Sequence, residues 1–512
     1  MTDHLATSRC PYCLQTKPRM TSATSSPGDA MEDVVDAEIK RTESLILRLF
    51  HERTRLYRKR NEIRSPIYSL PPEILTMIFK FACPPLDFLQ TYGLDSRPFI
   101  NYPIYPRILN TLNAVSARWR NIVLSTPSLW TSFVAEFITW DDSNINIMQT
   151  IFSHSRNLPV AASLDLTPVP ALYELRMAVL APVLQEYASR IHMLYTYNAP
   201  STWLKDNIPS FVNLELLCLE GDLHEDDVTS VDSTCTHLIL KGLSCRFSLS
   251  CSKIEVLHLG SMPVDVCLEL LQKCTHLKEY RLRDPCVDTF DAEVPLPSSP
   301  FILPRLKLFE WTVQYESPVH HAMLQYIRMP ALRTLVWVEE DINGVRPSSF
   351  LSTFFQHLPS TLSAIGIQYS FVHADHSIFS YFSKFSNIES LEFERCGGVF
   401  MAHVLNNLGS ETRSVGNQKM PVLPKLKSIH VDRSSGDFDQ AELLKTFRRR
   451  GSLLSESLGS PFRVEFAEHL VNWTPEFKEE LIRMVEKGYQ VELREDLKPV
   501  DWLPRTVKSP RR

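Results

Sequence analysis

One short apolar pattern recurs ten times between residues 191 and 431 of this 512-residue chain. In each copy an apolar residue is followed three positions later by a second and five positions later by a third, as at Ile254, Leu257 and Leu259. One such unit cannot bury its apolar face alone, so the pattern restricts this region to an array of stacked units. The copies begin at Ile191, Leu214, Cys235, Ile254, Leu277, Leu306, Leu332, Leu362, Ile388 and Leu426, and the first is the weakest.

The spacing inside each copy predicts a β-strand. Its second and third apolar residues are two positions apart, so they point to the same face of a strand, and the residue between them faces the other way. The first apolar residue of each copy comes before the strand and packs beneath the other two. Trp311 and Trp337 occupy the third position of their copies, so we expect them in the core and not as exposed stacking platforms.

The pattern and its spacing, mostly 19 to 30 residues, resemble the leucine-rich repeat over roughly residues 190–435. The resemblance implies an α/β solenoid, which we place at 132–435. The family's ladder asparagine is mostly absent and the repeat lengths vary, so we expect an irregular horseshoe with some units lacking a helix. An alternation of helix and strand then predicts a terminal cap over 436–500, because solenoids need their last ladder shielded, and a disordered basic tail at 501–512.

Two different segments precede the repeats. Residues 1–32 are rich in Ser, Thr and Pro and nearly lack apolar side chains, which predicts a disordered tail. Apolar residues near heptad spacing predict an amphipathic, coiled-coil-like helix over 33–64, ended by Ser65-Pro66. The basic run from Arg53 to Arg64 is compatible with an RNA or acidic-lipid contact, but a solvated helix face is the preferred interpretation.

Residues 65–131 predict a small all-α unit. Pro71-Pro72 opens a helix with a wide apolar stripe, because proline is tolerated in the first helical turn. The proline-rich stretch 84–107 predicts a loop or insertion, and a second helix is expected from Ile108 to about Leu124. The stripe consists of Ile74, Leu75, Ile78, Phe79 and Ala82.

This unit resembles an F-box. The resemblance rests on Leu70-Pro71-Pro72-Glu73-Ile74-Leu75, on Ile78-Phe79, on Val115-Ser116 with Trp119-Arg120 and Ile122, and on Pro127-x-Leu129-Trp130. Ser116 stands where cysteine is commoner in the family, and the insertion 84–107 is longer than the usual loop. Fungal F-box-like proteins are similar to this chain in both features. The resemblance implies docking onto the Skp-type adaptor of a cullin–RING ubiquitin ligase through residues 66–130.

The predicted adaptor-docking residues are the apolar side chains of this motif. A helical unit this small cannot bury them all within itself, so some must meet a partner or the solenoid. The alternative is that they cap the first repeat, and both roles can coexist. The set is Leu70, Pro71, Pro72, Ile74, Leu75, Ile78, Phe79, Val115, Trp119, Ile122, Leu129 and Trp130.

Composition and motifs exclude several classes of function. The net charge of -5 argues against a nucleic-acid partner, and no apolar run approaches the roughly 20 residues that span a bilayer. We therefore expect no membrane partner and a cytoplasmic or nuclear location. Phosphate-binding, dinucleotide-binding and hydrolase motifs are missing, so we expect neither an enzyme nor a cofactor. Cys10 and Cys13 have zinc-ligand spacing, but a structural zinc needs four ligands, so a chance pair is preferred.

The 11 cysteines are scattered, and several, such as Cys218 and Cys267, sit in apolar runs, as buried reduced thiols do.

These observations predict a substrate-recognition subunit that holds a protein target on the solenoid; the alternative is a ligase-independent leucine-rich-repeat scaffold. Target contacts are expected at the variable strand positions, which alternate with the buried ladder. Thr312, Val336 and Val338 form the apolar middle of this column, which starts basic and ends acidic. A merely solvated strand face is the alternative. The predicted target-binding residues are Arg281, Arg283, Glu310, Gln368, Glu392, Glu394, His430 and Asp432.

Overall fold

The computed structural model divides into two compact units, Met1–Leu75 (unit 1) and Thr76–Arg512 (unit 2). The residues that it describes are 27–84, 86, 88, 104–136, 142–167, 173–221, 229–231, 233–243, 247–249, 251–286, 297, 299–313, 323–339, 349–370, 379–382, 385–410, 412–415, 418–433, 439–457, 461–468 and 471–504.

Unit 1 contains one long helix, α1 (Pro27–Arg64), followed by the 3-10 turn η1 (Pro66–Ser69) and the first residues of α2 (Pro72–Ala82). The expected helix over 33–64 is present, but it begins at Pro27, so the predicted tail 1–32 is wrong for its last six residues. Proline is tolerated in the first turn of a helix, since the first amides have no partner there in any case. The rest of the predicted tail, with Cys10 and Cys13, lies outside the described residues.

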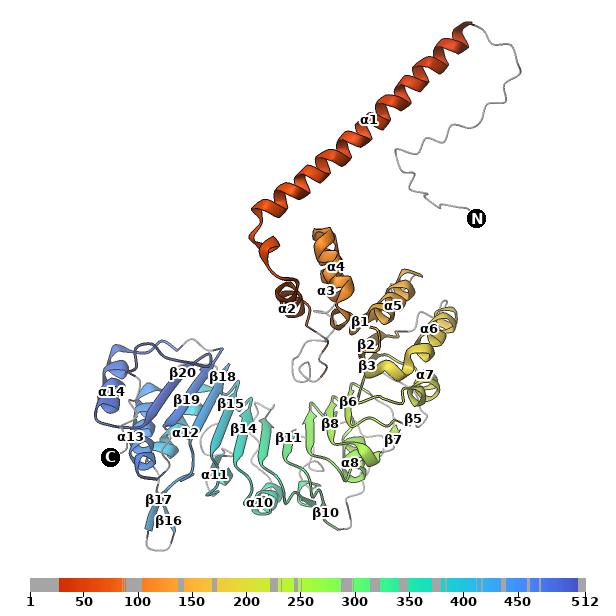
Figure 1. Cartoon of the computed structure of the whole chain (residues 1–512). Helices are drawn as coiled ribbons and strands as arrows, with labels where there is room; N and C mark the ends of the chain where they lie inside the picture. The colour runs from red at the N-terminus through yellow and green to blue at the C-terminus, as the bar shows by residue number, and fades with distance from the viewer. Residues whose placement is uncertain are drawn as a thin grey trace. The chain divides into compact units, whose positions relative to one another are not determined.

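Unit 2 begins with a small helical module and continues into one large sheet (Figure 1). The module consists of the rest of α2, α3 (Ile104–Val115), α4 (Ala117–Ser125) and the turn η3 (Pro127–Leu129). The longer helices that follow are α5 (Asp142–His154), α6 (Tyr173–Tyr187), α7 (Ser201–Asn207), α8 (Val264–Lys273), α10 (Ser349–Gln356), α11 (Phe379–Phe382), α12 (Gly398–Ser410), α13 (Gln440–Ser457) and α14 (Pro475–Glu486).

The sheet has 15 strands, and a strand stands at each of the ten sequence copies. Neighbouring strands pair in parallel, except for the last described pair, which is antiparallel. In order they are β1 (Ser132–Glu136), β2 (Val160–Asp165), β3 (Ile191–Tyr197), β4 (Leu216–Glu220), β6 (His237–Lys241), β8 (Val256–Gly260), β9 (Glu279–Arg283), β11 (Leu308–Val313), β13 (Thr334–Glu339), β14 (Ala364–Gln368), β15 (Ser390–Glu394), β18 (Ser428–Asp432), β19 (Phe462–Ala467), β20 (Val491–Glu495) and β21 (Lys498–Pro499).

Three short strand pairs lie outside this sheet. They are β5 (Thr229–Val231) with β7 (Phe247–Leu249), β10 (Phe301–Ile302) with β12 (Ile327–Arg328), and β16 (Thr412–Val415) with β17 (Gln418–Pro421). The 3-10 turns η4 (Ala188–Arg190), η5 (Ile208–Ser210) and η6 (Cys251–Lys253) precede strands of the main sheet.

The core lies between the sheet and the helices, where the repeated apolar residues form a continuous ladder. Trp311 and Trp337 are completely buried, as expected, and tilted aromatic contacts of Phe309 and Trp337 with Phe354 join the ladder to α10. Cys218 and Cys267 are buried and free, which confirms the prediction for these two thiols. The coarse prediction of an α/β solenoid-like fold therefore holds.

A residue with positive φ stands directly after many of the strands. Its amide donates to the last carbonyl of the next strand, as from Asn198 to Glu220 (2.8 Å) and from Arg395 to Asp432 (2.9 Å). The bonds continue the parallel ladder one residue beyond each strand and set the turn into the following segment. Positive φ occurs at this place in Asn198, Gly221, Gly242, Ser261, Asp284, Tyr369, Arg395, Arg433, Glu468 and Asp496.

Gly221→Ala is expected to destabilise unit 2 by about 1–3 kcal/mol, because φ is +141° there and a Cβ would lie 2.3 Å from Oδ1 and 2.6 Å from N of Asn198. Gly260→Ala is the matched control, since its Cβ would meet only the flexible side chain of Lys241 at 3.4 Å. Thermal unfolding of both variants checks this. Equal melting temperatures for the two variants would contradict it.

The C-terminal region differs from the predicted cap over 436–500. β19 and β20 continue the same parallel sheet, and among the described residues the antiparallel β21 is the last strand of that sheet. The predicted disordered tail 501–512 is wrong at its start, because the Trp502 ring packs 6.4 Å from Trp473 and 6.3 Å from Phe477. Residues 505–512 lie outside the described part of the chain.

Candidate functional site

The helix α2 exposes a continuous apolar stripe. Ile74 is 41% exposed, Met77 53%, Ile78 41% and Phe81 83%. These positions follow the i, i+3, i+4, i+7 spacing of one helical face, so the four side chains lie in a row. Adjacent exposed apolar side chains of this kind mark a surface that another molecule covers. We call these four residues the α2 stripe.

The opposite face of α2 is internal. Leu75 and Phe79 are 0% and 1% exposed. The Phe79 ring lies 4.8 Å from the Trp119 ring of α4, at an angle of 57° between the planes. The sequence predicts one wide apolar stripe on α2. The structure divides it into a buried face with Leu75 and Phe79 and an exposed face with Ile74 and Ile78.

A serine separates the two helices that follow. The expected single helix from Ile108 to about Leu124 is wrong, because Ser116 is extended and its Oγ accepts a hydrogen bond from the Trp119 amide (3.1 Å). Serine is favoured at such an N-cap because its side chain satisfies a free amide of the first turn. Val115, at the end of α3, is 55% exposed and is the predicted docking residue that this turn presents.

The last residues of the motif are buried, and Trp130 contacts both α4 and α5. Leu129 and Trp130 are buried, and Trp130 Nε1 donates to the carbonyl of Val123 (2.8 Å). The Trp130 ring lies 4.7 Å from the His154 ring of α5. Within unit 2 Trp130 therefore joins α4 to α5, and capping of the first sequence copy at Ile191 stays a prediction.

The structure thus divides the predicted adaptor-docking residues into two groups. A partner cannot reach the buried group unless the module opens, so their assignment as direct contacts is corrected to that of interior supports. The buried group is Leu75, Phe79, Ile122, Leu129 and Trp130. The accessible or partly accessible group is Leu70, Pro71, Pro72, Ile74, Ile78, Val115 and Trp119.

Two stripe residues, Met77 and Phe81, were missed in the sequence. They do not belong to the motif that carries the F-box resemblance. Their spacing from Ile74 and Ile78 was the available signal, because it marks a second apolar face beside that of Leu75 and Phe79.

The second candidate surface is the sheet face opposite the apolar ladder, which we call the open face. Register pairs its central positions across the whole sheet, one residue per strand. They are Val134, Ser163, Tyr195, Cys218, Ile239, His258, Arg281, Glu310, Val336, Gly366, Glu392, His430, Glu465 and Arg494.

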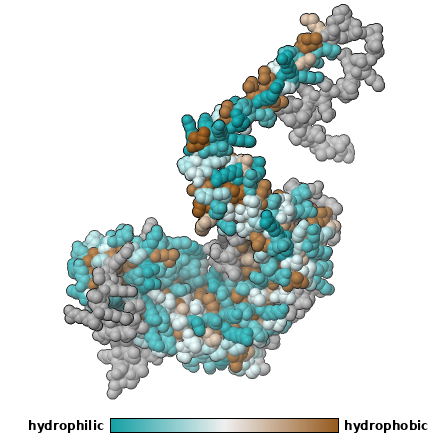
Figure 2. All heavy atoms as spheres, in the orientation of Figure 1, coloured by the Kyte–Doolittle hydropathy of each residue, from teal (hydrophilic) through white to brown (hydrophobic). Residues whose placement is uncertain are grey.

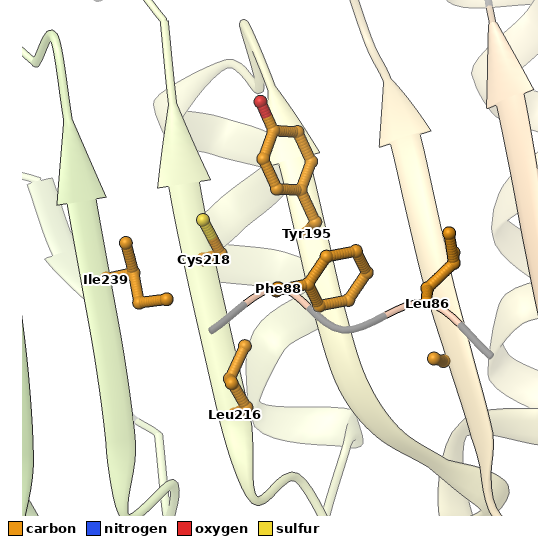
Figure 3. Packing of buried hydrophobic residues seen from close by; sticks show 7 residues of the cluster. Leu86, Phe88, Tyr195, Leu216, Cys218 and Ile239 are labelled. Carbon is orange, nitrogen blue, oxygen red and sulfur yellow. The ribbon is translucent and has the colours of Figure 1, made fainter. Parts of the chain in front are cut away.

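Leu86 and Phe88 cover the first part of the open face and are only 3% and 4% exposed. In Figure 3 these two residues lie in front of the strands, with helices behind the strands, and the Phe88 ring lies 5.7 Å from that of Tyr195. The Leu86 amide also donates to Ser132 Oγ (3.1 Å). The apolar side chains under these two residues are those of Ala161, Tyr195, Leu216, Cys218 and Ile239.

Thus part of the predicted insertion 84–107 is built into the sheet's surface. β3, β4 and β6 have apolar residues on both faces because both faces are covered, one by helices and the other by Leu86 and Phe88. Leu86 and Phe88 therefore occupy the open face of these strands.

Phe88→Ala is expected to uncover Cys218, whose burial raises the pKa of its thiol well above the usual value. Removing a buried phenylalanine costs about 3–5 kcal/mol, which shifts local opening by roughly 100-fold or more. Maleimide labelling of Cys218 should accelerate accordingly. Cys267, buried in α8, is the internal control and should keep its rate. An unchanged rate at Cys218 would contradict the packing.

The middle of the open face carries a chain of ion pairs. Buried His258 contacts Glu279 (Nε2–Oε1, 2.9 Å), and Glu279 contacts Arg281 (Oε1–Nε, 2.6 Å). Glu310, which is completely buried, pairs with Arg281 (Oε2–Nη1, 3.2 Å) and with Arg283. The hydrogen bond from His258, with the help of Arg281, lowers the pKa of Glu279 to about 2. Burial lowers the pKa of His258.

This network corrects three of the predicted target-binding residues. Arg281 and Arg283 form ion pairs with Glu279 and Glu310, and Glu310 is inaccessible. The column therefore does not start as a basic patch that is open to a target. The predicted apolar middle is also closed, because its three residues are buried. These are Thr312, Val336 and Val338.

The C-terminal part of the open face remains accessible and is acidic. Glu392 is exposed, and Glu394, His430 and Asp432 are half-buried, as is Gln368 on β14. Register places Glu392 beside His430 and Glu394 beside Asp432. Burial raises the pKa of Glu394, and the neighbouring charge of Asp432 adds to this, while Arg283 opposes it. We call Glu392, Glu394 and Asp432 the acidic patch.

Among the described residues, no group of three or more His, Cys, Asp or Glu side chains is arranged to hold a metal ion. No helix of this part of the chain is both long and apolar enough to cross a membrane.

Comparison with known families identifies one domain. Residues 67–136 match the model of the F-box-like family, which covers η1, the helical module and β1. A comparison with curated proteins finds no match for this chain. The chain therefore contains an F-box-like domain, and its α2 stripe belongs to that domain.

Proposed function

We propose that this protein is the substrate-recognition subunit of an SCF-type cullin–RING ubiquitin ligase. F-box-like domains generally bind Skp-type adaptors of such ligases, and residues 67–136 form one. In this proposal the domain docks onto the adaptor and the sheet holds a protein target. We place this activity in the cytoplasm or nucleus.

The observation that carries the proposal is the α2 stripe. Within the matched domain, the motif's buried residues support the helices, while Ile74, Met77, Ile78 and Phe81 stay exposed in a row. Full burial of one such side chain contributes about 1.5–3 kcal/mol. Four of them on a rigid helix suffice for the apolar centre of a specific interface.

We infer further that the solenoid is of the leucine-rich-repeat type. Support comes from the strands at all ten copies, their parallel register and the left-handed residue after most of them. Its irregularity has a visible cause, since helices between successive strands range from four residues in α11 to 18 in α13.

For the target, the acidic patch favours a protein segment rich in lysine or arginine. The covered strands and the internally paired arginines leave Glu392, Glu394 and Asp432 as the accessible charges of the predicted column. Complementary charge accelerates encounter and fixes the register of a complex. The protein's contribution is then proximity of target and ligase, with no chemical step of its own.

Co-expression of the full chain with a Skp-type adaptor tests the proposal. We expect a stable complex through size-exclusion chromatography, which recruits the cullin–RING core when that is added. A chain that folds but never retains the adaptor would instead support the ligase-independent leucine-rich-repeat scaffold.

The target surface needs a separate experiment. A photo-crosslinking residue at position 392 should attach to the target held by the chain–adaptor complex, whereas one at exposed position 479 of α14 should not. Crosslinks confined to position 479 would show that the target binds the helical side of the protein and not the open face.

A further inference from the structure

The helix α1 carries an apolar row on a surface that is exposed along its described side chains. Positions 39 and 46 correspond to heptad position a, and positions 35, 49, 56 and 63 correspond to position d. Figure 2 shows hydrophobic side chains recurring along this helix between hydrophilic ones. Each residue of the row is at least 47% exposed; they are Val35, Ile39, Ile46, Leu49, Leu56 and Ile63.

Charge is distributed unequally along the same helix. Residues 31–45 contain five acidic and two basic side chains, whereas residues 46–64 contain two acidic and seven basic ones. The first half is therefore negative and the second positive, and the residues around their boundary, from Leu45 to Phe50, are apolar except for Arg48. A helix of this kind is complementary to a reversed copy of itself.

We propose that α1 pairs with α1 of a second copy of this chain as an antiparallel coiled coil. In an antiparallel pair, position a of one helix faces position d of the other. Centring the pair on the apolar middle places Ile46 beside Leu49 of the second copy and Ile39 beside its Leu56. Symmetry repeats each of these layers, which gives four apolar layers.

The residues at the core positions disfavour a parallel pair. Arg53 and Arg60 also occupy position a, and in a parallel pair each would face its own copy across the core. Two layers of opposed arginines would have to be partly desolvated. In the antiparallel register Arg53 faces Thr42 and Arg60 faces Val35, so the guanidinium groups are separated and can extend toward water.

The charges at the flanking heptad positions e and g also favour the antiparallel pair. Glu38 and Lys59 lie at position g, and in the antiparallel pair each faces the other across the interface. A parallel pair would instead set Glu38 against Glu43 and Lys59 against Arg64. Opposite charges are favoured and like charges disfavoured at these positions, so the orientation follows from charge as well as from the core.

Sedimentation equilibrium of the purified full chain, without the adaptor, tests association. We expect a dimer in which Leu49→Asp produces a folded monomer, with helicity and the melting of unit 2 retained. Glu38→Lys is expected to weaken the dimer about five- to tenfold, and Glu38→Lys with Lys59→Glu to restore it. Glu62→Lys, on the outer surface of the pair, is the matched control and should change nothing.

Zero-length carbodiimide crosslinking tests the orientation. Within one helix Glu38 and Lys59 are about 31 Å apart at 1.5 Å per residue, so a crosslink between them must join two chains. A mixture of isotopically labelled and unlabelled chains should yield the mixed Glu38–Lys59 product. A monomer at tens of micromolar would overturn the proposal. So would a dimer that lacks the mixed Glu38–Lys59 product and whose crosslinks join the same end of both helices.

Discussion

Phe81→Asp combined with Met77→Asp is expected to abolish capture of a Skp-type adaptor while unit 2 keeps its fold. Both side chains are more than half exposed in the free protein, so aspartate is hydrated there and costs little. Covered by a partner, an unpaired carboxylate costs several kcal/mol, which corresponds to a loss of roughly 100-fold or more in affinity. Co-purification with the adaptor measures the effect.

Two matched variants separate docking from folding. Phe81→Leu keeps an apolar side chain on the α2 stripe and should retain the adaptor. Phe79→Ala removes the buried ring against Trp119 and should lower the melting temperature, at a cost of about 3–5 kcal/mol. If the double aspartate variant retains the adaptor at wild-type level, the stripe is not the docking surface.

The repeated strands could be predicted from sequence because their signal is local. The apolar pattern of one copy is contained in six residues, as from Ile254 through Leu257 to Leu259, and stacking then follows from the burial requirement alone. The strands after residue 460 were also predicted, but their place in the same sheet was not. Parallel pairing with β18 depends on contacts that the copies' spacing does not encode.

The docking surface was only partly predictable. The F-box motif is defined by residue type. It therefore includes both apolar residues that are buried inside the module and apolar residues that are exposed on its surface. Leu75 and Ile78 have the same chemistry and lie on one helix, but their exposures are 0% and 41%. The two exposures depend on which face of α2 is covered: Phe79, on the same face as Leu75, packs against Trp119 of α4, and the separation of α4 from α3 depends on one serine cap at Ser116.

The open face was the least predictable part. Alternation places Glu310 away from the ladder, which predicts an accessible target contact or, as the alternative, a solvated side chain. Its burial depends on Arg281 and Arg283, 29 and 27 residues earlier, and on neighbours that no spacing in the sequence indicates. Similarly, Phe88 reaches Tyr195 from a stretch more than 100 residues away in the chain.

Glu310→Gln is therefore expected to destabilise the solenoid, by about 3 kcal/mol. Its side chain is 1% exposed, and its carboxylate faces the guanidinium groups of Arg281 and Arg283, which are 28% and 19% exposed. Removing one partner of a buried pair leaves charge without its counter-charge, which typically costs 3–5 kcal/mol, and the partial exposure of the arginines favours the lower end. Chemical denaturation followed by circular dichroism measures the loss.

Glu392→Gln provides the matched control, because this glutamate occupies the equivalent strand position, three strands further along the sheet, and is exposed. It should change stability by less than about 0.5 kcal/mol. Adding Arg283→Gln to Glu310→Gln should cost less than the sum of the two single changes, since a double-mutant cycle reports their direct coupling. Additive losses would show that Glu310 stabilises the sheet through its packing, and not through the arginines.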